Sequence, residues 1–161
     1  MSLNLVGLGH FHPPTEISNE FLGSLDIGTD DEWIMERVGI RSRRTVLPLD
    51  YIRQTKNCEL RAAAEAAQYS NAALGAKAAE LALERAGISA GEIGLVIGGS
   101  CAPDTASPAE ACNLAGLLGL EAASLDINSA CTSFLAGIHL LSMMREESLP
   151  DYVLLVSMES M

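Results

Sequence analysis

Short apolar runs of strand length alternate with helical segments along this chain. The runs span residues 3–8, 93–99, 123–128 and 152–158. In the second run, Leu95, Val96 and Ile97 follow one another without polar alternation, which suits a strand covered on both faces of its sheet. Strands that alternate with helices are typical of layered domains with a largely parallel sheet. The sequence therefore predicts an α/β fold.

Two helix starts carry capping signals. Thr29 and Glu32 form a T-x-x-E capping box, which predicts a short helix to residue 37. Ser107, Pro108 and Glu110 form a second such start, with proline at the first helical position, where its missing N–H costs nothing. This second helix should end before the glycine at 119.

Two longer helical stretches complete the pattern. The Ala-rich stretch 60–86 predicts two helices, separated where Ser70 or Asn71 caps the second one, and Gly87 should end it. Residues 132–147 predict a last helix. The side chains that we expect this last helix to offer to the core are Phe134, Ile138, Leu141 and Met144.

Charge is distributed unevenly along the chain. The 161 residues are 48% hydrophobic and 19% charged, as in one globular domain, and the net charge of −11 argues against a nucleic-acid-binding surface. Residues 37–61 nevertheless hold seven of the ten basic side chains. This stretch could be an anion site for a phosphorylated ligand or a solvated surface patch, and both interpretations stay open.

Four cysteines are spread widely along the sequence, at Cys58, Cys101, Cys112 and Cys131. They form no C-x-x-C pair and have no neighbouring pair of histidine ligands, so we expect no metal site. The sequence shows no secretory signal pattern and no apolar run near the ~20 residues that span a bilayer. We therefore expect a cytoplasmic protein with free thiols and no membrane partner.

One cysteine lies where a strand should turn into a helix. Cys131 lies between the predicted strand 123–128 and the predicted helix 132–147. Free backbone N–H groups and the positive end of the helix dipole meet at such a turn, and both favour the thiolate that a nucleophile needs. A cysteine in a core turn can also be buried and inert. The residues alone leave both interpretations open.

Three stretches together resemble one known family. Residues 29–43 resemble the T-x-x-E-W-I-x-x-R-x-G-I-x-x-R signature of the β-ketoacyl-acyl-carrier-protein synthase III family, in the thiolase superfamily. Residues 111–120 and 126–134, which include the A-C-T-S-F turn around Cys131, resemble further segments of that family in the same order. The resemblance covers nearly the whole chain.

The resemblance implies a thiolase-like layered fold, normally built from two similar halves in an αβαβα architecture. Residues 1–161 match the amino-terminal half, with a longer connection at about 48–71, and we expect the carboxy-terminal half to be absent. The family's histidine and asparagine for decarboxylation lie in that second half. We therefore expect the isolated chain to be incomplete for condensation.

The resemblance also implies an activity and a site. The family transfers an acyl group from coenzyme A to its cysteine, here Cys131, and condenses it with malonyl-acyl-carrier protein in fatty-acid or polyketide synthesis. Trp33 would stack on the coenzyme A adenine, Thr29 would lie beside it, and Arg37 would contact the phosphates. Coenzyme A thioester would be a substrate, with no permanently bound cofactor. Acyl carrier protein and a second copy of the chain are the implied partners.

Two alternative functions and one alternative role for a residue remain. The chain could be a non-condensing half-domain that binds or scaffolds a partner subunit. It could also belong to a related condensing enzyme such as a thiolase or a hydroxymethylglutaryl-CoA synthase, although the W-I-x-x-R-x-G-I run disfavours both. Trp33, the only tryptophan, could instead be a core residue.

Overall fold

The computed structural model describes residues 3–160, and the chain divides into two compact units. Unit 1 comprises the described parts of 1–11 and 70–161, and unit 2 comprises His12–Tyr69. Each unit has its own secondary structure and is described by itself below.

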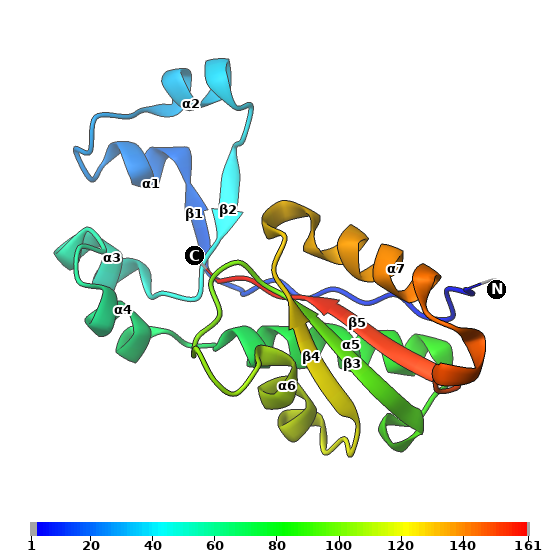
Figure 1. The fold of residues 1–161 in the computed structure, drawn as a ribbon. Helices are drawn as coiled ribbons and strands as arrows, with labels where there is room; N and C mark the ends of the chain where they lie inside the picture. The colour runs from blue at the N-terminus through cyan, green and yellow to red at the C-terminus, as the bar shows by residue number, and fades with distance from the viewer. Residues whose placement is uncertain (1–2, 161) are drawn as a thin grey trace. The chain divides into compact units, whose positions relative to one another are not determined.

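Unit 1 is built on a three-stranded parallel sheet (Figure 1). Its strands are β3 (Ile93–Gly99), β4 (Ala123–Ile127) and β5 (Tyr152–Ser157), in the order β4-β3-β5. Gly99 at the end of β3 is level with Ile127 on one side and Ser157 on the other. The predicted parallel sheet is confirmed, and its carboxyl ends meet at one edge.

Helices cover both faces of this sheet. They are α5 (Asn71–Ala86), α6 (Glu110–Leu118) and α7 (Ser133–Met143), with 3₁₀ turns η1 (Ala90–Glu92), η2 (Ala130–Thr132) and η3 (Glu146–Ser148). Figure 1 shows α5 and α6 on one face and α7 on the other. Val96 packs into the α5–α6 cluster, while Leu95 and Ile97 pack with Leu141 of α7. Both faces of β3 are thus buried, as its unbroken apolar run predicts.

The ends of α5 are as predicted, whereas α7 is shorter. The Ser70 hydroxyl accepts a hydrogen bond from the Ala73 N–H at 3.1 Å, and Gly87 ends α5 with a φ of 68°. Helix α7 ends at Met143 rather than at 147. Two of its expected core residues are exposed, Phe134 by 37% and Ile138 by 41%, so that part of the prediction is wrong.

The predicted strand at 3–8 is also wrong. These residues form no strand, and their backbone lies against α5. A side chain at Gly9 would clash with the Ala78 carbonyl oxygen, and the Arg85 guanidinium donates to the Leu8 carbonyl at 2.7 Å. A strand needs a partner for its backbone groups, and no described strand pairs with this segment. The apolar run alone could not reveal that.

Helix α6 begins later than predicted and is capped from a strand. It starts at Glu110, and Ser107 caps nothing. The Asp126 carboxylate on β4 instead accepts the N–H groups of Glu110 at 2.7 Å and Ala111 at 2.8 Å. Asp126 satisfies two unpaired donors of the first turn and places a negative charge at the positive helix end. A distant residue thus replaces the local capping box.

We expect Asp126→Ala to lower the free energy of unfolding by about 0.5–2 kcal/mol, because it removes the cap of α6. Urea unfolding followed by circular dichroism measures this change. Asp151→Ala, at an exposed aspartate just before β5, is the matched control and should change stability much less. Equal losses in both variants would contradict the capping role.

Unit 2 contains a small antiparallel pair of strands and four short helices. The strands are β1 (Glu16–Ser18) and β2 (Ser42–Arg44), and the helices are α1 (Asn19–Gly23), α2 (Asp31–Arg37), α3 (Leu49–Thr55) and α4 (Leu60–Ala66). The predicted helix to residue 37 is present, but its cap is Asp30, not Thr29. The Asp30 carboxylate accepts the Trp33 N–H at 2.8 Å. An aspartate one position later thus outcompetes the threonine of the predicted box.

Two findings concern residues 3–160 as a set. None of their helices is long and apolar enough to cross a membrane. No group of three or more of their histidine, cysteine, aspartate and glutamate side chains could hold a metal ion.

Candidate functional site

Cys131 lies on a tight turn between β4 and α7. It sits in the 3₁₀ turn η2, and its side chain is an exposed free thiol. The preceding residue, Ala130, has a φ of 47°, in the left-handed region that costs a non-glycine residue on the order of 1–3 kcal/mol. Strained strand-to-helix turns of this kind present nucleophiles in other folds. The interpretation of Cys131 as a buried thiol is wrong, and its role as a nucleophile stays a prediction.

A buried serine holds this turn closed. The Ser133 side chain is 1% exposed; its hydroxyl accepts the Ser129 N–H at 2.9 Å and donates to the Ala130 carbonyl at 2.8 Å. The Thr132 hydroxyl also donates to the Ser129 carbonyl, at 2.7 Å. These bonds span the residues on both sides of Cys131. They offset the local strain and fix the position of the sulfur.

Gly99, the last residue of β3, packs closely against the Cys131 turn. A side-chain carbon at Gly99 would lie 2.9 Å from the Ser133 Cβ, closer than real Cβ atoms approach. Only glycine therefore allows the sheet to approach the residue that closes the Cys131 turn.

The arrangement suits a covalent nucleophile. Among the described residues, no hydrogen bond occupies the Cys131 backbone N–H. Helix α7 begins two residues later, so its dipole directs positive potential toward the sulfur. An exposed thiol, a free N–H donor and a helix start together can form a thioester and stabilise the oxyanion on the way to it.

A second polar cluster lies at the same edge of the sheet, after β3 and β5. Glu159 accepts the N–H groups of Cys101 at 2.8 Å and Ala102 at 3.2 Å, and the Ser100 hydroxyl at 3.4 Å. A hydrogen bond to Glu159 raises the pKa of the Cys101 thiol, and smaller effects of burial and of negative charge on Glu159 and Cys131 act in the same direction. The Cys101 thiol therefore feels the charge of the Cys131 sulfur.

The contact between Glu159 and Cys101 was not predicted, because 58 residues separate the two in the sequence. One signal was available. Polar residues that follow parallel strands gather at the carboxyl edge of a sheet, where ligands bind in open α/β folds. Both residues follow predicted strands of this kind.

In unit 2, Trp33 and Arg37 lie together on α2. The Trp33 side chain is 47% exposed, so the interpretation of this tryptophan as a core residue is wrong. The Arg37 guanidinium carbon lies 4.7 Å from the centroid of the Trp33 ring, and its Nη1 lies 3.2 Å from the Glu36 carboxylate. The pair offers a flat apolar face beside a positive charge, as the i, i+4 spacing predicts.

Thr29 and Asn19 complete this region. The Thr29 hydroxyl oxygen is buried and makes no hydrogen bond within the described residues. The Asn19 amide group donates to Asp31 in α2 and to the Ile40 carbonyl, both at 2.8 Å, and accepts from Arg43 at 2.7 Å. Asn19 therefore links the first residue of α2 and the segment that follows this helix to β2, which helps to fix the helix that carries Trp33.

The basic stretch is largely engaged in contacts within unit 2. These contacts are Arg43 with Asn19, Arg44 with Glu16, Arg53 with the Phe21 ring and Arg61 with Glu65. Helix α4, which carries Arg61, has no buried residue. The contacts favour a solvated surface over one continuous anion site.

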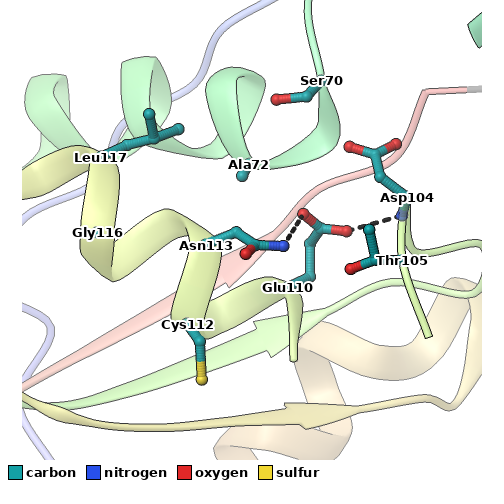
Figure 2. Close-up of a pocket in the computed structure, with 9 residues that line it drawn as sticks. All are labelled: Ser70, Ala72, Asp104, Thr105, Glu110, Cys112, Asn113, Gly116 and Leu117. Atoms are coloured by element: carbon teal, nitrogen blue, oxygen red, sulfur yellow. Dashed lines mark hydrogen bonds between the residues drawn. The ribbon is translucent and has the colours of Figure 1, made fainter. Parts of the chain in front are cut away.

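A pocket of about 510 Å³ lies elsewhere in unit 1, between α6, the start of α5 and the loop at 104–105. Figure 2 shows the Glu110 carboxylate inside it, where it accepts the Asp104 N–H at 2.8 Å and the Asn113 amide at 3.4 Å. Cys112 is among the lining residues, but its sulfur points away from this carboxylate. The Glu110 carboxylate is already hydrogen-bonded within the chain. We therefore interpret its contacts as structural, because they hold the loop at 104–105 against α6.

Comparison with known proteins agrees with this geometry. The family described as "Thiolase, N-terminal domain" matches residues 55–161. The chain is 34% identical to β-ketoacyl-[acyl-carrier-protein] synthase III of Anaplasma marginale and 38% identical to that of Alkalilimnicola ehrlichii, covering 96% and 83% of this chain. It spans 42% and 36% of the lengths of these two relatives. The crystal structure of the priming β-ketosynthase from the R1128 polyketide biosynthetic pathway matches 96% of this chain and 40% of its own, with a TM-score of 0.78 and 27% identity.

Proposed function

Because the chain belongs to the thiolase amino-terminal domain family and is similar to synthases III along nearly its whole length, we propose that it is the acyl-accepting part of such a synthase. The observation that carries the proposal is Cys131, an exposed thiol on a strained turn at the start of α7. In this proposal Cys131 is the nucleophile that takes an acyl group from acyl-coenzyme A.

The first half-reaction is the transfer of the acyl group to Cys131, and the geometry of the Cys131 turn suits it. The Cys131 thiolate attacks the thioester carbonyl carbon, and a new carbon–sulfur bond forms while the carbonyl oxygen becomes an oxyanion. The free Cys131 N–H and the α7 dipole stabilise that charge. Collapse of the intermediate breaks the bond to the coenzyme A sulfur, which leaves as a thiolate and takes up a proton from water.

Coenzyme A recognition is proposed for unit 2. The exposed face of Trp33 is available to stack on the adenine ring, and Arg37 beside it can pair with phosphate oxygens. Thr29 directly precedes the same helix, and we propose that it lies beside the adenine, as the resemblance implies.

The second half-reaction is proposed to condense the acyl group with malonyl-acyl-carrier protein, in fatty-acid or polyketide synthesis in the cytoplasm. The resemblance implies that the histidine and asparagine for decarboxylation belong to a carboxy-terminal half that residues 1–161 do not include. We propose that this half and a second copy of the chain complete the working enzyme. Residues 1–161 alone are then expected to accept an acyl group without condensing it.

The test is to incubate the chain with acetyl-, butyryl- and octanoyl-coenzyme A and to map adducts by peptide mass spectrometry. One acyl group on the peptide that contains Cys131 is the expected result. An adduct on Cys58 or Cys112 instead would overturn the assignment. The absence of any adduct on a chain that is folded by circular dichroism would favour the non-condensing half-domain that binds a partner subunit.

Trp33→Ala is expected to raise the Kd for coenzyme A about 5- to 150-fold, because a stacked base contributes about 1–3 kcal/mol. Isothermal titration calorimetry measures this change. Trp33→Phe keeps an aromatic face and should lose much less affinity. If both variants bound as tightly as the parent chain, Trp33 would not be the adenine platform.

A further inference from the structure

The second thiol at the edge of the sheet has no role in the proposed acyl transfer. Cys101 follows β3, Cys131 follows β4, and β3 and β4 are neighbouring parallel strands with Gly99 level with Ile127. Both thiols are exposed and free. Two cysteines beyond the same ends of paired strands form a cluster that a lone nucleophile does not require.

Hydrogen bonds fix the positions of both residues. Glu159 accepts the N–H groups of Cys101 and of Ala102 and so holds the loop that follows β3. Ser133 closes the Cys131 turn, and its Cβ lies against the backbone of Gly99, two residues before Cys101. The two cysteines are therefore attached to parts of the backbone that touch each other.

The electrostatics of Cys101 agrees with this arrangement of the two loops. The pKa of Cys101 is raised, first by its hydrogen bond to Glu159 and also by negative charge on Cys131. Cys58 and Cys112 have no such effect on Cys101. The interaction between two charges weakens with distance and with screening, so this effect agrees with two loops that lie side by side.

We propose that Cys101 is a resolving thiol for Cys131, so that a peroxide converts the two residues into a reversible disulfide. The Cys131 thiolate attacks one oxygen of hydrogen peroxide, which breaks the O–O bond and gives a sulfenic acid and hydroxide. The Cys101 sulfur then attacks the sulfenic sulfur, and an S–S bond forms as water leaves. The Glu159 carboxylate, which accepts the Cys101 N–H at 2.8 Å, lies beside this residue and can take up the proton that the thiol loses.

The disulfide would have two consequences. It removes the free Cys131 sulfur that the proposed function requires, so acyl transfer stops until a dithiol reductant opens the bond. It also protects Cys131 from further oxidation to sulfinic and sulfonic acids, which thiols do not reverse. This inference rests on the proposed function only for the first consequence, because disulfide formation needs no acyl group.

The test uses the full 161-residue chain, treated with an equal amount of hydrogen peroxide and then blocked with an alkylating agent. The expected product lacks two hydrogen atoms, resists alkylation at two cysteines and yields a peptide cross-linked between Cys101 and Cys131. Dithiothreitol should restore both thiols. A cross-link that includes Cys58 or Cys112, or no cross-link at all, would overturn the proposal.

Two serine variants sharpen the result. Cys101→Ser should carry sulfenic acid at Cys131 after the same treatment, and sulfinic or sulfonic acid after a several-fold excess of peroxide. Cys112→Ser should form the disulfide as the parent chain does. Circular dichroism checks that both variants are folded. The reduced chain is assayed separately for acyl adducts. A disulfide without acylation would then refute the proposed function alone, and acylation without a disulfide would refute this inference alone.

Discussion

Cys131→Ala is expected to abolish the acyl adduct, with the acylation rate falling by more than about 10³-fold. The reason is chemical, because alanine has no sulfur and no neighbouring group holds the same position on the turn between β4 and α7. The rate is measured by intact-protein mass spectrometry over a time course with acyl-coenzyme A. The variant should fold normally, since the replaced side chain is exposed and the bonds that close the turn come from Ser133 and Thr132.

Cys112→Ala is the matched control for this experiment. Cys112 is also a free thiol at the surface, but it lies within α6, and its sulfur is 3.9 Å from the Ser124 carbonyl oxygen. Its loss should leave the acylation rate within about twofold of the parent, as expected for a residue outside the site. A Cys131→Ala chain that still gained an acyl group at the parent rate would refute the nucleophile assignment.

Gly99→Ala is expected to have the second largest effect. Its new methyl group would lie 2.9 Å from the Ser133 Cβ, so Ser133 must move, and the Cys131 turn that it closes must move with it. Overpacking of this kind costs about 1–3 kcal/mol of stability. A small displacement of a reacting group can cost about 10²-fold in rate. Urea unfolding and the acylation time course measure the two effects on the same sample.

The control for this glycine is Gly116→Ala. Gly116 lies within α6, and a Cβ there meets nothing within 4 Å. Because alanine is the better helix former, the variant should be more stable by about 0.5–1 kcal/mol, with acylation unchanged. If Gly99→Ala kept both parent stability and parent rate, the close packing of Gly99 against Ser133 would have no functional importance.

The sheet of unit 1 was predictable because its signals are local. The unbroken apolar run at 93–99 implies a strand buried on both faces, and β3 has those bounds. The break at Ser70 was also predictable, since a serine cap acts on a backbone N–H three residues ahead. The position of Cys131 on a strand-to-helix turn followed from the same local reasoning.

What could not be predicted depends on contacts between distant residues. Asp126 caps α6 from a neighbouring strand, and Glu159 accepts a hydrogen bond from Cys101, which lies 58 residues earlier in the sequence. Neither contact has a sequence signature, because each depends on how the strands are ordered in the sheet. The wrong strand prediction at 3–8 has the same origin. An apolar run can form a strand only where a partner strand is present to pair with its backbone groups, and the run itself does not reveal that partner.

The single tryptophan has a practical consequence for measuring how this chain unfolds. Trp33 is the only indole in the sequence and lies on α2 of unit 2. Its fluorescence therefore reports on unit 2 alone, whereas far-ultraviolet circular dichroism is dominated by the longer helices α5, α6 and α7 of unit 1. Coincident melting curves from the two signals would mean that the units unfold cooperatively, and separate curves would assign a melting temperature to each unit.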